Sequence, residues 1–361
     1  MTPKTTAEDA GQLIAAIRTR AVGAGIDPNE YEDVTGNLAD AAGWTPACNA
    51  AAAGHLAAAQ SAALNGYRVT AAESYLAAAR WAHFATCWPN PDRSAHAAAA
   101  RQASAAYRQA LGLLDPAATW VGDGAGPAPF SGVLRRPGGG ALAPLVLLVC
   151  GLDSGKEEFH YVAEALLARG LAVFAFDGPG QGELSGATTV ESRYERVMAH
   201  VLDVLAARAD PGVDLSRTGA VGLSLGGFYV IRAAVAESRV AAAVTVSGVT
   251  ALPWDDLPAG ITATLAQRAG GDAAARAFAG DVDAAPLASS LKIPLLVVAG
   301  GQDPIPAPQQ ARAIGAAAPR GQLLFVEGGD HLLANRQWQW IGSAADWLAA
   351  RLASPGLAAV S

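Results

Sequence analysis

The sequence predicts an α/β fold, in which a mostly parallel, doubly wound sheet follows a separate domain of helices. Residues 1 to about 120 are rich in alanine and carry apolar and aromatic residues at helical spacing, with almost no β-branched run. The segment DGAGPAP at 123–129 has the composition of a linker. After it, short apolar runs alternate with helix-like segments, which is typical of a parallel sheet covered on both faces.

The N-terminal part is best interpreted as a plain helical bundle. Leu13, Ile14 and Ile17 illustrate its helical spacing, and the prolines of WPNPDR at 88–93 separate two of its helices. A tetratricopeptide-like pattern occurs once, at 66–78, whereas stacked repeats need about three copies. We therefore predict a helical domain at residues 1–125.

Residues 126–361 form the second predicted domain. Its expected strands are apolar runs that end in glycine or a turn: FSGVLRRP, PLVLLVCG, GLAVFAFDG, TGAVGLS, VAAAVTVSG, IPLLVVAGG and QLLFVEGG. Helices are expected at 157–169, 191–209, 225–236, 307–317 and 335–352. Residues 252–290 interrupt this alternation, and we interpret them as a lid-like insertion.

A serine between glycines gives the first indication of chemistry. AVGLSLGG at 220–227 contains G-x-S-x-G, with Ser224 at its centre. The motif follows a predicted strand and opens a predicted helix, which is the context in which such a serine is a nucleophile on a strained turn above the sheet. A serine in an ordinary glycine-rich turn is the alternative.

A base and an acid follow the serine in the expected chain order. A serine hydroxyl is a weak nucleophile and needs a base, which an acid must orient. Asp303 comes after the run IPLLVVAGG and His331 after QLLFVEGG, so both are expected past the carboxyl ends of strands. Alternatively, Asp303 caps a helix and His331 lies in a surface loop. We predict that Ser224, His331 and Asp303 form a catalytic triad.

Two backbone N–H groups are expected to stabilise the oxyanion, those of Leu225 after the nucleophile and of Leu152 in the loop after PLVLLVCG. The neighbouring Asp153 is a candidate substrate-binding residue. We interpret the glycine-rich segment DGPGQGELS at 177–185 as a tight structural loop beside the site. In the run KEE at 156–158, the acids either favour a helix N-terminus beside a solvated lysine or help to close the helical domain.

Composition limits the possible partners. The net charge of −7 disfavours nucleic acid, and no apolar run is long enough to span a bilayer. Three widely spaced cysteines without metal-binding spacing, and a polar N-terminus, favour a reduced cytoplasmic chain. We expect a small-molecule substrate, no nucleic-acid or membrane partner, no metal and no cofactor; a homodimer stays open.

Five motifs carry a more specific resemblance: CGLDSGKEEF, FDGPGQGE, GLSLGG, GGQDPIP and GGDH. Together they resemble one branch of the α/β-hydrolases. That branch holds the 2,6-dihydroxypseudooxynicotine hydrolase, the fungal polyketide-shortening hydrolases of pigment biosynthesis and the fermentation-respiration switch proteins. The resemblance covers about residues 128–352, and the N-terminal helices resemble the helical cap of that branch. It implies an α/β-hydrolase fold whose site is closed by this N-terminal cap.

The resemblance also implies a reaction. Members of this branch cleave carbon–carbon bonds beside a ketone or shorten polyketide chains. One member uses an extra carboxylate on the segment after the strand that follows the nucleophile helix, where this chain has Asp255 and Asp256. Asp255 is therefore a candidate site residue. Tyr229 and Trp254 are candidates for lining the pocket, with core or lid packing as their alternative.

The expected function is a serine-dependent hydrolase that cleaves a carbon–carbon bond next to a ketone, in an aryl ketone, a 1,3-diketone or a polyketide-like substrate of secondary metabolism. An esterase, thioesterase or acyl-chain cyclase is the first alternative. A non-catalytic ligand receptor on the same fold is the alternative from another class.

Overall fold

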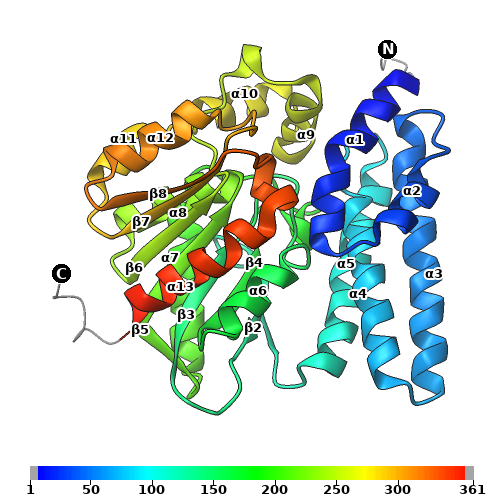
Figure 1. The fold of residues 1–361 in the computed structure, drawn as a ribbon, viewed down its shortest axis with the longest axis horizontal. Helices are drawn as coiled ribbons and strands as arrows, with labels where there is room; N and C mark the ends of the chain where they lie inside the picture. Colours follow the sequence, from blue (N-terminus) through cyan, green and yellow to red (C-terminus); the bar gives the residue numbers. More distant parts are fainter. Residues whose placement is uncertain (1–6, 354–361) are drawn as a thin grey trace.

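The computed structural model describes residues 7–353, which form a helical bundle beside a large sheet with its own covering helices (Figure 1). Alanine favours helix, and its small side chain lets α3, α4 and α5 lie side by side. Within residues 7–353, no helix is both long and apolar enough to cross a membrane. The bundle consists of α1 (Ala7–Ala24), α2 (Pro28–Thr35), α3 (Trp44–Leu64), α4 (Arg68–Phe84) and α5 (Arg93–Leu114).

The eight-stranded sheet has the spatial order β1-β2-β4-β3-β5-β6-β7-β8. β2 pairs antiparallel with β1 and β4, and the pairs from β4 through β8 are parallel. The carboxyl ends of the parallel strands therefore meet at one edge of the sheet. The strands are β1 (Thr119–Asp123), β2 (Phe130–Arg135), β3 (Ala143–Val149), β4 (Ala172–Asp177), β5 (Val213–Leu223), β6 (Val240–Val246), β7 (Leu295–Gly300) and β8 (Gly321–Val326).

Helices cover both faces of the sheet. Along β3, Leu145 and Leu147 face the layer of α7 (Tyr194–Arg208) and α8 (Leu225–Ala236), while Val146 and Leu148 face the opposite layer. That opposite layer contains α6 (His160–Leu167), α13 (Ile341–Leu352) and apolar residues of α4 and α5. Both sides of each central strand are thus buried, which explains why these strands are apolar throughout.

Residues 252–290 form a short helical cluster that contacts the bundle. A 3₁₀ turn at Trp254–Asp256 leads into α9 (Ala259–Ala269), α10 (Asp272–Asp281) and α11 (Ala285–Ser290), and α12 (Pro308–Ala317) follows β7. Gln267 of α9 accepts hydrogen bonds from the Asn90 backbone N–H at 2.9 Å and from the Arg93 side chain at 3.1 Å. The insertion therefore lies against the loop between α4 and α5.

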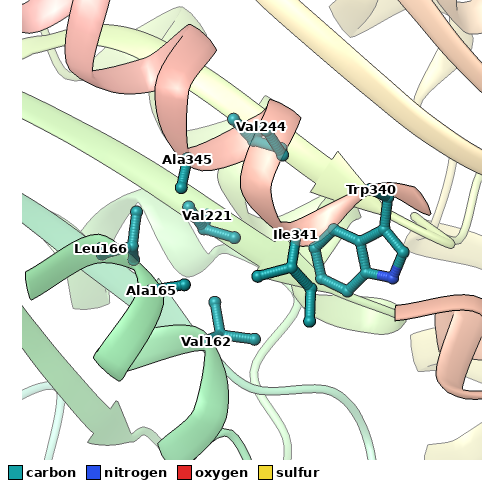
Figure 2. Close-up of a pocket in the computed structure, with 9 residues that line it drawn as sticks. Val162, Ala165, Leu166, Val221, Val244, Trp340, Ile341 and Ala345 are labelled. Atoms are coloured by element: carbon teal, nitrogen blue, oxygen red, sulfur yellow. The ribbon is translucent and has the colours of Figure 1, made fainter. Parts of the chain in front are cut away.

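A small void lies between α6, α13 and the sheet (Figure 2). It measures about 10 Å³, and its wall is apolar, with Val162, Val221 and Trp340 among its residues. A space of this size is at the lower limit for one water molecule, and it offers that water no polar wall. The void is a packing defect of the core and has no room for a substrate.

The prediction of an α/β fold with a mostly parallel sheet and N-terminal helices is confirmed. The sequence analysis missed β1, which is short, mostly half-buried and lies ahead of residue 126. The helix expected at 335–352 begins only at Ile341. Leu332 and Leu333 have left-handed backbone conformations, so the segment before α13 forms irregular turns instead of a continuous helix.

Buried ion pairs attach the bundle to the loop that follows β3. Arg20 of α1 binds both carboxylate oxygens of Glu158, at 2.5 and 2.8 Å, and donates to Asp153 at 2.8 Å. His83 of α4 lies with its Nε2 2.9 Å from Glu158. Although burial opposes the charge of Glu158, Arg20 and His83 hold the pKa of its carboxyl well below the usual range. Two helices of the bundle thus share one buried carboxylate of the sheet domain.

The surroundings of the His83 imidazole favour its protonated form. Burial disfavours its charged form, but Cys87 and Glu158 favour it more strongly and raise the pKa of His83 well above its usual range. Its Nδ1 also faces Glu157 at 3.6 Å. A protonated ring adds to the positive charge that Arg20 and Lys156 place beside the two adjacent buried glutamates.

Close packing of α8 against β3 requires glycine at position 226. An added Cβ there would overlap the backbone carbonyl oxygens of Val149 and Cys150. The start of α8 therefore lies directly against the end of β3. No larger residue fits unless one of the two backbones moves.

Substituting Gly226→Ala should lower the free energy of unfolding by about 1–3 kcal/mol, because the new methyl group meets backbone atoms that cannot swing aside. Gly54→Ala is the matched control. Gly54 is exposed within α3 and has no atom within 4 Å of an added Cβ, so alanine should stabilise the helix by about 0.5–1 kcal/mol. Urea unfolding of both variants checks the contrast, and equal effects would contradict it.

The raised pKa of His83 predicts a pH-dependent stability. The unfolded chain loses this proton above about pH 6.5, whereas the folded protein retains it, so the stabilisation is complete below about pH 6.5 and is lost as the pH rises. His83→Gln should therefore flatten the fall in unfolding free energy between about pH 7 and 9. His160→Gln is the control, since burial lowers the pKa of His160 to about 3 and its ring is neutral throughout this range. An unchanged slope in His83→Gln would rule out the protonated ring.

Candidate active site

Ser224 stands on a sharp turn between β5 and α8 with φ 54° and ψ −123°, a strained conformation for a residue with a side chain. Hydrogen bonds hold this turn on both sides. The Ser224 N–H donates to the Val246 carbonyl at 2.9 Å, and the Ser224 carbonyl accepts from the Val249 N–H at 3.0 Å. Its hydroxyl is thereby fixed at the carboxyl edge of the sheet.

The structure brings Ser224, His331 and Asp303 together. The Ser224 Oγ lies 3.0 Å from Nε2 of His331, and Nδ1 of the same ring lies 3.0 and 3.2 Å from the two oxygens of Asp303. Asp303 is buried, and its Oδ1 also accepts the Ile305 N–H at 2.9 Å. The His331 side chain is 34% exposed, so water can reach the ring. A carboxylate that accepts from Nδ1 leaves Nε2 free to take the serine proton.

A second strained pair fixes the histidine loop. Ser247 follows β6 and Leu332 follows His331, and both have positive φ angles, 49° and 65°. The Leu332 N–H donates to the buried hydroxyl of Ser247 at 2.8 Å. This hydrogen bond connects the end of β6 to the residue beside the imidazole. Sequence analysis missed Ser247, whose only signal is its place directly after a strand.

The backbone N–H groups of Leu152 and Leu225 are available for a ligand. Within residues 7–353, neither group has a protein acceptor. Leu225 is the first residue of α8, where helical N–H groups lack an intrahelical partner. The loop that carries Leu152 lies against the nucleophile, because a Cβ added at Gly151 would come within 3.0 Å of the Ser224 Cβ. The two donors therefore flank the serine.

The charged residues after this loop are held inside the protein. Asp153 is partly exposed and paired with Arg20, so its carboxylate is not a free substrate ligand. Lys156 is fully buried, with its Nζ 2.7 Å from Asp177 and 3.0 Å from Glu183. Burial disfavours the charge of Lys156, but these carboxylates and Glu157 raise its pKa. The alternative in which Lys156 is solvated is therefore wrong.

Three candidate pocket residues make packing or pairing contacts of their own. Tyr229 is fully buried and stacks on Tyr194 with ring centroids 3.9 Å apart. Trp254 is half-buried and its ring lies under the guanidinium of Arg276. Asp255 has a side chain that is 90% exposed and pairs with the same arginine. The 3₁₀ turn that carries Asp255 directs it to solvent, so its position does not support a role in substrate binding.

No metal site is built into the described part of the chain, since no cluster of three or more histidine, cysteine, aspartate or glutamate side chains there could hold an ion. A surface recess of about 300 Å³ lies along residues 127–129 and 188–191. Neither this recess nor the small core void includes a triad residue in its wall. The recess therefore lies apart from the three side chains at the sheet edge.

Comparison with protein families gives one match. The family described as serine aminopeptidase, S33 matches residues 141–279, which include the strained serine and both oxyanion-donor candidates. The match ends before Asp303 and His331.

Curated relatives match parts of the chain. The 2,6-dihydropseudooxynicotine hydrolase of Paenarthrobacter nicotinovorans is 35% identical over 43% of this chain and 42% of its own length. The 20-hydroxy-prefusarin hydrolase of Gibberella moniliformis is 40% identical over 34% of this chain and 29% of its own. The matching regions thus span less than half of these two relatives.

Solved structures match over nearly the whole chain. The crystal structure of the 2,6-dihydroxy-pseudo-oxynicotine hydrolase has a TM-score of 0.82 at 24% identity and covers 93% of this chain and 95% of that one. The protein AbyA5 has a TM-score of 0.72 at 20% identity, covering 96% and 99%. At these identities the two structures establish the fold. The fold is therefore that of the α/β-hydrolases, and over the matching regions the chain is similar to proteins named as hydrolases.

Proposed function

We propose that the chain is a serine hydrolase that cleaves a carbon–carbon bond next to a ketone, through a covalent acyl-enzyme on Ser224. The observation that carries the proposal is the continuous hydrogen-bonded chain from Ser224 through His331 to the buried Asp303. This arrangement is what general-base activation of a serine requires. A ligand receptor that has lost catalysis has no need to keep all three contacts.

The first half-reaction forms the acyl-enzyme. His331 takes the hydroxyl proton as Ser224 Oγ bonds to the substrate carbonyl carbon, and the resulting oxyanion accepts from the N–H groups of Leu152 and Leu225. Collapse of this intermediate breaks the bond to the leaving group. For a carbon leaving group, the electron pair of that bond passes to the carbon, where a second ketone or an electron-rich ring delocalises it, and His331 returns the proton.

Water completes the reaction. His331 removes a proton from water as the oxygen attacks the acyl carbon, and the Ser224 oxygen leaves and regains the proton. The partial exposure of the His331 ring supports access for that water. Cleavage beside a ketone is the more specific part of the proposal, and it is supported by the resemblance of five motifs to a branch whose members cleave such bonds.

A test of the covalent mechanism uses a fluorophosphonate probe and two substrate series, β-diketones and p-nitrophenyl esters. Wild-type protein should be labelled at Ser224, and Ser224→Ala should lose both the label and turnover. Faster turnover of β-diketones than of esters supports carbon–carbon cleavage. Turnover of esters alone would contradict carbon–carbon cleavage and support an esterase. An unlabelled Ser224 would indicate a non-catalytic receptor.

The orienting role of Asp303 is tested separately. Asp303→Asn should lower kcat by about 10³–10⁴-fold, because the amide no longer holds the ring with Nε2 free to accept a proton. Asp346→Asn is the control. It removes an exposed carboxylate of α13 that pairs with Arg169, and it should retain wild-type kcat. Steady-state kinetics per labelled site measures both, and comparable kcat in the two variants would disprove the assignment of Asp303.

A further inference from the structure

We infer that Gln181 positions the oxyanion hole, because its side-chain amide holds the backbone of the loop at 150–152 so that the Leu152 N–H faces the reacting carbonyl. The inference rests on the proposed function, which gives the Leu152 N–H its role as a donor. Gln181 lies in the glycine-rich loop after β4 and contacts neither Ser224 nor His331. It is a positioning residue that acts through the loop.

The side-chain amide of Gln181 makes four hydrogen bonds, two through its nitrogen and two through its oxygen. Its Nε2 donates to the carbonyl oxygens of Cys150 at 2.7 Å and Gly151 at 2.8 Å. Its Oε1 accepts from the Gly178 N–H at 2.9 Å and from the Tyr194 hydroxyl at 2.8 Å. The side chain is fully buried. No other side chain within residues 7–353 donates to these two loop carbonyls.

The partners determine which way the amide points. Gly178 presents a backbone N–H, which can only donate, so the oxygen of the amide must face it. Cys150 and Gly151 present carbonyl oxygens, which can only accept, so the NH₂ group must face them. A carboxylate at position 181 would satisfy the first side and repel the second.

The planarity of the peptide bond transmits this contact to the donor. The Gly151 carbonyl and the Leu152 N–H belong to one trans peptide, so they point in opposite directions. Gln181 binds the carbonyl from the protein interior, and the Leu152 N–H is thereby turned away from that interior. The same loop lies against Ser224, since a Cβ added at Gly151 would nearly touch the Ser224 Cβ. Rotation of this single peptide would withdraw the donor from the site.

The residues that hold Gln181 in place form a rigid arrangement. Tyr194, which donates to Gln181, is fully buried and stacks on Tyr229 with an interplanar angle of 8°. At the start of the glycine-rich loop, Asp177 accepts the Lys156 N–H at 2.8 Å and its Nζ at 2.7 Å. The two loops are therefore joined at both ends of the 150–156 segment. Such support is what keeps a backbone donor in place before the substrate binds.

Two substitutions of Gln181 and one control separate positioning from general stability. Gln181→Glu keeps the acceptor side and replaces the donor with an oxygen, while Gln181→Met keeps the shape and removes all four hydrogen bonds. Tyr107→Phe is the matched control, because it removes one hydrogen bond of a buried tyrosine, between its hydroxyl and Nδ1 of His160 at 3.0 Å, and leaves Gln181 and its four partners unchanged. If Gln181→Glu fails to fold, the activity of Gln181→Met alone tests whether Gln181 positions the oxyanion donor.

Kinetics on p-nitrophenyl acetate should be expressed per active site, with sites counted by exhaustive fluorophosphonate labelling. We expect kcat per site to fall about 10- to 100-fold in both Gln181 variants, less than the 10²–10³-fold loss of a donor removed outright. KM and the pH midpoint of the rate should stay at wild-type values, because neither binding nor His331 is touched. Tyr107→Phe should stay within about threefold of wild-type kcat, since the donor remains aligned.

Crystal structures of wild type and Gln181→Met give a readout independent of turnover, in which the Gly151–Leu152 peptide should be rotated in the variant. An unlabelled wild-type Ser224 would overturn the proposed function. A labelled wild type together with unchanged kcat per site in Gln181→Met, an equal loss in Tyr107→Phe, or an unrotated peptide would overturn only the role of Gln181.

Discussion

The strained backbone at Ser224 is the constraint on which the rest of the site depends. A residue with a side chain reaches φ 54° only when its surroundings compensate for the strain. Here the end of β6 accepts its N–H, the following loop donates to its carbonyl, and α8 approaches β3 so closely that only glycine fits at position 226. The nucleophile is thus held by the sheet itself, and its hydroxyl needs no side-chain support beyond His331.

Around this turn, two loops are fixed by buried side-chain hydrogen bonds to their backbone. Ser247 binds the N–H of Leu332 and so holds the histidine loop, while Gln181 binds two carbonyls of the loop after β3. Ser247 follows β6 and Gln181 follows β4, so both contacts start past the carboxyl ends of parallel strands. Residues at one edge of a parallel sheet can therefore orient one another even where their positions in the chain are distant.

The three triad side chains could be predicted from the sequence because a doubly wound sheet places the residues that follow its parallel strands at one edge. The positions after β5, β7 and β8 are defined by apolar runs, and Ser224, Asp303 and His331 come within a few residues of the ends of those strands. Arg20 and His83 carry no such signal, since helical periodicity does not tell which face meets a distant loop. For Asp255 the local pattern gave the position in the chain, but the direction of a single 3₁₀ turn decided that its carboxylate faces solvent.

The division of the buried charges between the bundle and the sheet domain limits how far the two can be treated as exchangeable modules. Arg20 and His83 come from one side, and Glu158 with Glu157 from the other. A chimaera with a foreign cap would leave the buried Glu158 without Arg20 and His83, the two cap side chains that bind it. An exchanged cap would therefore need basic side chains at the positions of Arg20 and His83 to be compatible with this sheet domain.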